Sequence, residues 1–214
     1  MTSHIDRPIE TGTTRRDALG VAMALLGGAL SVGMAPGAST RTGDTCLIGY
    51  DAAFEDALAE ADARTPAGGG RLGQAGLPGV FALPLRRGYR VTARYGVRGN
   101  WLAGHHTGID LAVPRGTPVY AVSAGTVVLA QRSGDYGNAV TVRMPEGHYA
   151  VYGHLNRIRT RSGARISAGA RIADSGSTGR ATGPHLHLEI RVRRPYGSDV
   201  DPVTYLARRG VRLL

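Results

Sequence analysis

Alternating histidines mark a stretch near the C-terminus, where residues 183–191 read GPHLHLEIR. Side chains two positions apart in a β-strand share a face, so His185, His187 and Glu189 are expected to project together. Two imidazoles placed in this way lie ~6.6 Å apart along the backbone, close enough to serve one metal-centred site. The pattern alone also fits a polar strand face, so it indicates a metal site without establishing one.

A second segment with metal-ligand chemistry is residues 106–110, which read HTGID. On a flat strand, His106 and Asp110 would lie ~13 Å apart, too far to share a metal ion. We expect the two side chains to meet only if Gly108, with its permissive backbone, lets the chain curl between them. Taken alone, the segment is more simply interpreted as a glycine-containing turn with surface polar groups.

The third segment, residues 152–155, reads YGHL and places His154 at the end of an apolar run. A histidine in this position is most often a hydrogen-bonded core or edge residue. Together the three segments are far more specific than any one of them. Two histidines and a carboxylate around zinc leave a fourth position for water, which is the catalytic type of site. Two further imidazoles would supply the proton-transfer groups that such a water needs.

The elements that must position these side chains are short strands and tight turns. Residues 118–122, 126–129, 139–143 and 149–152 are β-branched or aromatic runs, separated by turns that contain glycine. Such regular short runs, with no helical periodicity between them, predict an all-β fold, either a compact antiparallel sandwich or an open barrel. Asp201 and Pro202 are expected to begin a short helix that ends at Leu206.

Composition limits the chemistry further. The chain has 214 residues, a net charge of +10 and a single cysteine, so a disulfide framework and a Cys-rich metal site are excluded. All 26 basic residues are arginines, and residues 80–214 carry 20 of them against 7 acids. This balance points to a polyanionic partner, which could be nucleic acid, anionic lipid or an acidic wall polymer.

The N-terminal part divides into two regions. Residues 1–38 are interpreted as an export signal, because Arg15 and Arg16 precede an apolar run from 18 to 35 that four glycines weaken. The signal is of the twin-arginine type, with a general secretory signal as the alternative. Cleavage near Ala38 is expected, and an uncleaved anchor would also place the rest of the chain outside the cytoplasm.

Residues 39–79 are expected to join the signal to the domain at 80–214. They comprise an acidic helix over 49–64 and a Gly/Pro linker. The helix is predicted to be a solvated spacer. A less favoured alternative is that it lies over the basic groove before activation, with the Cys46 thiol as a further inhibitory group.

From Leu83 to Leu206 the chain resembles the lysostaphin/LytM-type zinc endopeptidases, which cut peptide crosslinks in bacterial peptidoglycan. The resemblance rests on residues 95–98 (YGVR), 106–110 (HTGID), 116–118 (GTP), 152–155 (YGHL), 176–179 (GSTG), 183–189 (GPHLHLE) and 201–202 (DP). The glycine-rich turns are weak signals, whereas the three histidine segments in this order are strong. The resemblance implies a compact antiparallel β-structure with a groove across one sheet.

The resemblance also implies a role for each site residue. His106, Asp110 and His187 would bind one zinc ion per chain, and His154 and His185 would act on the water. Several members of the family carry a tyrosine shortly before the first ligand. Residues 100–105 contain none, and Trp101 is expected to line the groove instead. Glu189 would either orient a histidine or form a surface ion pair with an arginine.

The sequence therefore predicts an exported zinc endopeptidase that hydrolyses peptide crosslinks of peptidoglycan. The alternative is a non-catalytic wall-binding protein that activates another cell-wall hydrolase through the same groove. Anionic wall polymers would suit the arginines, whereas a nucleic-acid partner would leave the export signal and the histidines unexplained. A monomer, secreted or associated with the cell wall and without a stable transmembrane span, is expected.

Overall fold

The structure, a computed structural model, describes residues 51–64, 80–101 and 103–214. These residues fall within one compact unit of the chain, Thr42–Leu214. The predicted export signal at 1–38, Cys46 and the linker at 65–79 lie outside the described residues. In the described part, no helix is long and apolar enough to cross a membrane.

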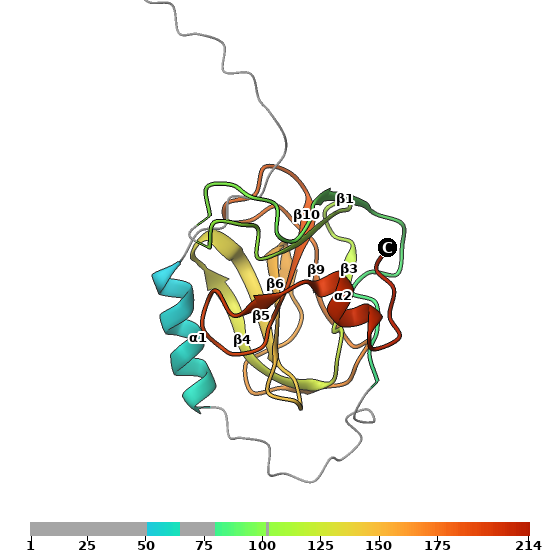
Figure 1. Ribbon diagram of the computed structural model, residues 1–214. Coiled ribbons are helices and arrows are strands. Elements are labelled where there is room, and N and C mark those ends of the chain that lie inside the picture. Colours follow the sequence, from blue (N-terminus) through green and yellow to red (C-terminus); the bar gives the residue numbers. More distant parts are fainter. Residues whose placement is uncertain (1–50, 65–79, 102) are drawn as a thin grey trace, which may run out of the picture. The chain divides into compact units, whose positions relative to one another are not determined.

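Short antiparallel strands dominate the described residues (Figure 1). The elements in chain order are α1 (Ala52–Arg64), β1 (Arg90–Ala93), β2 (Gly108–Ala112), β3 (Pro118–Tyr120), β4 (Gly125–Ser133), the 3-10 helix η1 (Gly134–Tyr136), β5 (Gly137–Arg143), β6 (Tyr149–Leu155), β7 (Arg157–Ile158), β8 (Arg165–Ile166), β9 (Arg171–Asp174), β10 (His185–Arg191), β11 (Asp199–Val200) and α2 (Pro202–Ala207). The four strands expected from the apolar runs are all present, three of them longer than predicted and β3 shorter. Asp201 caps α2 as expected, because its side chain accepts a hydrogen bond from the Val203 amide.

The larger sheet has the strand order β1-β2-β10-β6-β5-β4-β8, with β11 paired to β10. A smaller sheet has the order β3-β9-β7. The path of the larger sheet is open, with β1 and β8 at its ends, which confirms the all-β prediction without closing a barrel. Strands β2, β10 and β6 are neighbours, and the register places His187 opposite Asp110 on one side and Gly153 on the other.

Alternation along β10 separates the core from the site. Leu186, Leu188 and Ile190 are fully buried in the main hydrophobic core, as the two-residue period predicts. His187 and Glu189 on the opposite face are also fully buried. The strand therefore lies between a hydrophobic core and a buried polar layer. Buried polar groups of this kind need partners, because unpaired ones destabilise the fold.

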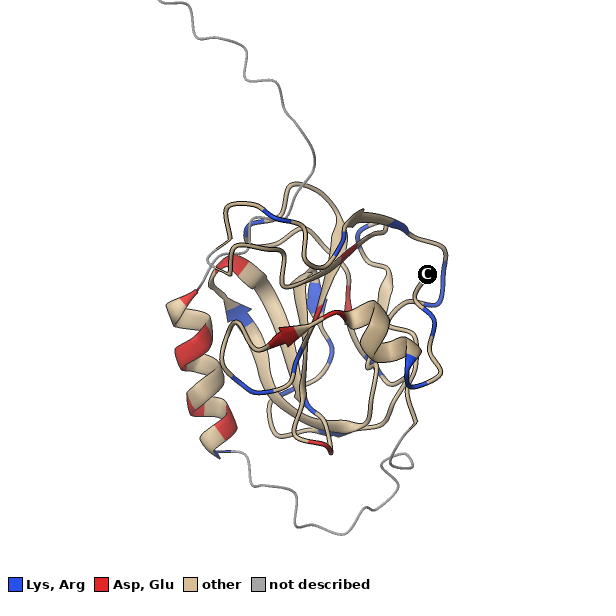
Figure 2. Ribbon diagram, in the orientation of Figure 1, with Lys and Arg blue, Asp and Glu red and all other residues tan. Residues whose placement is uncertain are grey.

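The prediction that α1 is a solvated spacer is wrong. Phe54 and Leu58 are both 0% exposed and belong to a second hydrophobic cluster with residues of β4, η1 and β6, including Tyr136. Figure 2 shows acids along the helix, and two of them face the sheet rather than solvent. Glu55 is 7% exposed, and Asp62 accepts hydrogen bonds from Arg143 and Tyr149. The helix is thus packed on the β-domain through one apolar and partly acidic face.

An ion-pair cluster at the end of β9 gives a pH-dependent prediction. Both carboxylate oxygens of Asp174 lie 2.9 Å from Arg159 Nε, and Arg171 adds a second guanidinium. The hydrogen bond from Arg159 is the main cause that lowers the pKa of Asp174, with Arg171 acting in the same direction. A lowered pKa in the folded state stabilises the fold above the unfolded pKa of about 4 and is lost as the pH falls through the folded value.

We therefore expect Asp174→Asn to lower the free energy of unfolding at neutral pH and to flatten its decline below about pH 4. Urea unfolding at a series of pH values measures both effects. Asp56→Asn, on the exposed face of α1, is the matched control and is expected to keep the wild-type pH profile. A wild-type profile in Asp174→Asn would contradict the stabilising role of the cluster.

Candidate metal centre

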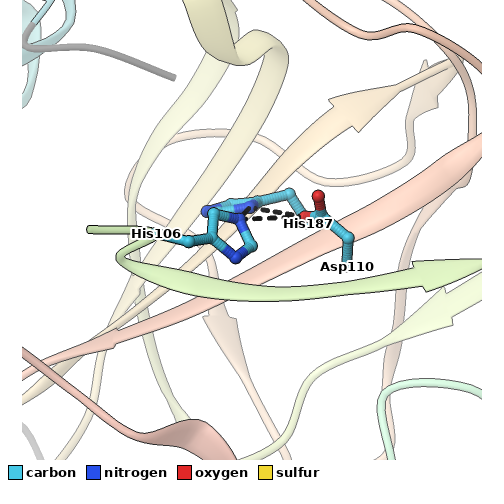
Figure 3. Close-up of side chains that lie close together, drawn as sticks. All are labelled: His106, Asp110 and His187. Atoms are coloured by element: carbon cyan, nitrogen blue, oxygen red, sulfur yellow. Dashed lines mark hydrogen bonds and ion pairs between the residues drawn. The ribbon is translucent and has the colours of Figure 1, made fainter. Parts of the chain in front are cut away.

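Three ligand atoms from distant parts of the chain converge beside the β2–β10 pair. His106 Nε2 lies 3.2 Å from His187 Nδ1, and Asp110 Oδ1 lies 2.9 Å from His187 Nδ1 and 3.3 Å from His106 Nε2. Figure 3 shows the two rings and the carboxylate turned toward one another. All three residues are buried, with at most 1% exposure. The structure thus brings together the three predicted ligands.

Gly108 makes this approach possible, but not in the predicted way. Its backbone lies outside the left-handed region and simply begins strand β2. A Cβ at this position would lie 2.6 Å from His187 Cε1 and 2.5 Å from the Leu188 carbonyl oxygen. The glycine is therefore required because the His187 ring packs directly against the main chain, and not because a special φ lets the chain curl.

The far side of each ligand ring is held by a second contact. His106 Nδ1 lies 3.1 Å from the Arg94 carbonyl oxygen, and His187 Nε2 lies 3.3 Å from Glu189 Oε2. Each ring can donate its N–H to that oxygen, which leaves His106 Nε2 and His187 Nδ1 as lone-pair atoms facing Asp110. Metal-binding histidines in proteins are typically oriented by such outer partners.

Charge at the centre favours an ionised carboxylate. Burial alone would raise the pKa of Asp110. When no metal is bound, a proton on the facing nitrogen of His106 or His187 can be donated to the carboxylate, and these hydrogen bonds hold the pKa of Asp110 well below its usual range. Three lone-pair donors within 3.3 Å of one another repel unless a cation or proton lies between them. Two imidazoles and one carboxylate are therefore a donor set that fits a divalent metal ion.

The two further histidines of the prediction lie beside this centre. The ring centroids of His154 and His185 are 4.7 Å apart, and those of His154 and His187 are 6.0 Å apart. His154 Nδ1 lies 2.8 Å from the Thr178 carbonyl oxygen, and His185 Nδ1 lies 2.8 Å from that of Gly183. His185 Nε2 is 3.7 Å from Asp110 Oδ1. All five predicted site residues are thus gathered in one place.

The backbone at His154 is unusual. Its φ of 58° is in the left-handed region, and no other non-glycine residue in the described ranges has a positive φ. Such a conformation costs on the order of 1–3 kcal/mol and persists only where surrounding contacts enforce it. Strain of this kind is concentrated at functional sites. Here the strained residue lies at an irregularity in the β5–β6 pairing, one position before the end of strand β6, and its imidazole lies beside that of His185.

An open cavity of about 190 Å³ borders the centre. Its lining residues come from β1, β2, the turn before β10 and the first position of β10, and they are Arg90, Thr92, Asp110, Ala112, Thr182, Gly183, Pro184 and His185. Trp101, which was expected to line the groove, is not among them. The indole is only 6% exposed and packs against His106 with 5.5 Å between ring centroids, so it supports a ligand from behind.

The remaining histidines take other partners. His105 lies 2.8 Å from Asp199, and His148 lies 3.1 Å from the Tyr205 hydroxyl, as expected for residues outside the site. Glu189 is fully buried, contacts His187 and also pairs with Arg191. Both alternatives for Glu189 are therefore realised, except that the ion pair is internal and not at the surface.

Sequence reasoning missed three residues that hold Glu189 in place. Thr107 and Tyr136 each donate a hydrogen bond of 2.9 Å to Glu189 Oε2, and Arg191 binds the other oxygen. The two-residue period that identified His185, His187 and Glu189 extends to Arg191, so this residue could have been found. Tyr136 lies in a 3-10 helix between strands, where no local pattern indicates a partner.

Comparison with known proteins places this site in a family. The family model described as Peptidase family M23 matches residues 104–202. The chain is 46% identical over 99 residues to the DD-carboxypeptidase/endopeptidase Mpg of Neisseria meningitidis, and 44% identical over 88 residues to the peptidoglycan DD-endopeptidase ShyA of Vibrio cholerae. These matches cover 46% and 41% of this chain but only 22% and 20% of the relatives, so the chain spans about a fifth of their length.

A solved structure extends the likeness to a whole catalytic domain. The catalytic domain of the antimicrobial peptidase lysostaphin from Staphylococcus simulans is 34% identical, with a TM-score of 0.53. The similarity covers 56% of this chain and 92% of that domain. The residues that match the family, 104–202, include all five site residues, in agreement with the resemblance noted from the sequence. This chain therefore belongs to peptidase family M23.

Proposed function

We propose that this protein is an exported, zinc-dependent endopeptidase that hydrolyses peptide crosslinks of bacterial peptidoglycan. The observation that carries the proposal is the buried cluster of His106, Asp110 and His187 with the imidazoles of His154 and His185 beside it. The name of the relative ShyA, a peptidoglycan DD-endopeptidase, supports peptidoglycan as the substrate.

In this proposal one zinc ion is held by His106 Nε2, His187 Nδ1 and Asp110 Oδ1. Zinc fits because nitrogen and oxygen donors are its usual ligands, and a set of three is typical of catalytic sites. When bound, zinc would polarise the scissile carbonyl and make a water molecule acidic near neutral pH. Arg94 and Glu189 would keep the two ligand rings in the required orientation through their far nitrogens.

His154 and His185 would move the protons. Because the Nδ1 atom of each ring is directed at a backbone carbonyl, Nε2 is the atom that can accept a proton. One of the two would take the proton from the attacking water, and the other would protonate the leaving amine or stabilise the developing oxyanion.

The cavity beside Asp110 and His185 would receive the substrate. Arg90 lines it, and among the described residues this guanidinium has no hydrogen-bond or ion-pair partner. A free cation at the wall of the groove suits a peptide that carries carboxylates. The other exposed arginines would favour anionic wall polymers, so that binding to sacculi should weaken as salt increases.

Residues 1–38 would act as the export signal and residues 80–214 as the peptidase domain. The mature protein would then be secreted or associated with the cell wall, without a stable transmembrane span, and we expect a monomer.

Digestion of purified sacculi tests the function. We expect the protein to release new free amines, to lose this activity after treatment with a chelator, and to regain it when zinc is restored. Mass analysis of the released fragments would identify the bond that is cut. If no amines are released but a second wall hydrolase is stimulated, the non-catalytic activator is the correct function instead.

A further inference from the structure

Helix α1 lies outside the residues that match the family, yet it contributes a charged group to the interior of the domain. Glu55 is 7% exposed, and its Oε1 accepts a hydrogen bond of 2.7 Å from Arg191 Nη1. Its Oε2 accepts a second hydrogen bond, of 3.2 Å, from the Tyr196 amide. An unpaired buried carboxylate would destabilise the fold, so the hydrogen bonds from Arg191 and Tyr196 are needed to keep Glu55 buried.

Arg191 connects this helix to the polar layer behind the metal centre. Its side chain is 0% exposed, and its Nε donates to Glu189 Oε1. Its Nη2 donates to the Tyr136 hydroxyl at 3.0 Å. Although burial alone would lower the pKa of Arg191, the charges of Glu189 and Glu55 hold it well above its usual value. The guanidinium is therefore a permanent cation between two carboxylates.

Glu189 completes the connection to a ligand. One oxygen binds Arg191, and the other lies 3.3 Å from His187 Nε2. Burial and the neighbouring Glu189 raise the pKa of Tyr136 well above its usual value, so the phenol keeps its proton and donates it to this second oxygen. An unbroken series of charged hydrogen bonds thus leads from Glu55 through Arg191 and Glu189 to the ring of His187.

An aromatic series runs parallel to the polar one. The Phe54 ring stacks on Tyr136 with centroids 4.2 Å apart, and Tyr136 meets His187 edge to face at 5.8 Å. Trp101, which packs on His106, belongs to the same hydrophobic cluster as Phe54. The apolar face of α1 therefore supports both ligand rings from behind.

We propose that α1 is a positioning element of the metal centre, in which Glu55 fixes Arg191 and, through Glu189, the orientation of the His187 ring. This inference rests on the proposed metal site and argues against the alternative that the helix covers the groove as a removable lid. No residue of α1 is among those that line the cavity beside Asp110 and His185. Removing α1 would therefore weaken metal binding at the centre and would not make the cavity more accessible.

The test compares Glu55→Gln with Glu60→Gln in the full chain. Both variants exchange one carboxylate of α1 for an amide, but Glu60 is 63% exposed and, among the residues that the structure describes, its ion-pair partner is the solvent-exposed Arg64. Removing a residue that contacts a ligand directly usually weakens metal binding by about 10- to 100-fold. Because Glu55 acts on His187 through Arg191 and Glu189, we expect Glu55→Gln to give the lower end of this range, about 10-fold, and Glu60→Gln to bind as wild type. Competition with a chromophoric chelator measures the affinity.

A second measurement reports on ring orientation without metal. In the metal-free protein, the ¹⁵N shifts of the His187 ring should change in Glu55→Gln, whereas those of His148, whose ring contacts Tyr205 and Glu146, should not. A helix that only adds stability would lower the melting temperature and leave the ring shifts unchanged. Phe54→Leu, which keeps an apolar side chain but loses the stacking, should also change the His187 shifts. This variant provides the test if Glu55→Gln does not fold.

The outcomes separate this inference from the proposed function. Wild-type zinc affinity together with unchanged His187 shifts, in Glu55→Gln or in its substitute Phe54→Leu, would overturn the positioning role and leave the metal assignment intact. If the wild-type chain binds no zinc, but the His187 shifts still differ between the wild type and Glu55→Gln, the metal assignment is refuted and the contact from α1 to the ring is supported.

Discussion

His187→Ala is expected to abolish stoichiometric zinc binding and to lower kcat/KM on sacculi by about 10³-fold or more, since a metal ion supplies several kcal/mol of transition-state stabilisation. The substitution removes Nδ1, the atom that lies closest to Asp110 Oδ1. It also leaves the buried carboxylates of Asp110 and Glu189 each without one hydrogen-bond partner. Metal analysis of the purified protein and quantification of released amines measure the two effects.

His148→Ala is the matched control for this experiment. His148 is a partly exposed histidine whose ring contacts Tyr205 and Glu146 and is not one of the five site residues. We expect its removal to change neither zinc content nor the rate of cleavage. If His187→Ala retained both at wild-type levels, the ligand assignment would be incorrect.

His154→Asn should give the second large effect, with a different signature. We expect kcat to fall by about 10²- to 10⁴-fold, the usual contribution of a general acid–base group, while zinc remains bound. Asparagine is the appropriate replacement because it tolerates the left-handed backbone that His154 adopts at φ 58°. The variant thus removes the imidazole without adding backbone strain.

Zinc content distinguishes this result from damage to the metal centre. Stoichiometric zinc with a much lower kcat would place His154 in proton transfer, and His148→Asn should again behave as wild type. Loss of zinc from His154→Asn would instead make His154 a supporting residue of the ligands. An unchanged kcat with intact zinc would remove His154 from the mechanism altogether.

The sequence predicts those structural features that are determined by residues close together in the chain. Period-two alternation placed Leu186, Leu188 and Ile190 in the core and the histidines on the opposite face. Glycine-containing turns located the strands, and the order of three histidine segments identified the family. Each of these signals depends on residues that lie within a few positions of one another.

Features that depend on distant contacts were not predictable in the same way. Glu55 is one of several acids on an alanine-rich helix, and nothing near it in sequence distinguishes it from exposed Glu60. Its partner, Arg191, lies 136 residues away. The role of Gly108 was misjudged for a similar reason, because the His187 ring that excludes a Cβ comes from another strand. Trp101 was expected at the groove, since its burial behind His106 depends on the packing of the second cluster.

The separation between bonded partners also bears on biosynthesis. His106 and His187 are 81 residues apart, and the contact from Glu55 to Arg191 closes nearly the whole of the described chain. Contacts of such long range form only after the intervening polypeptide has been made, because one partner is missing until then. They also form slowly, because the entropy of closing a long loop opposes them. A nascent or truncated chain that ends before β10 therefore lacks His185 and His187 and cannot assemble the five-residue centre.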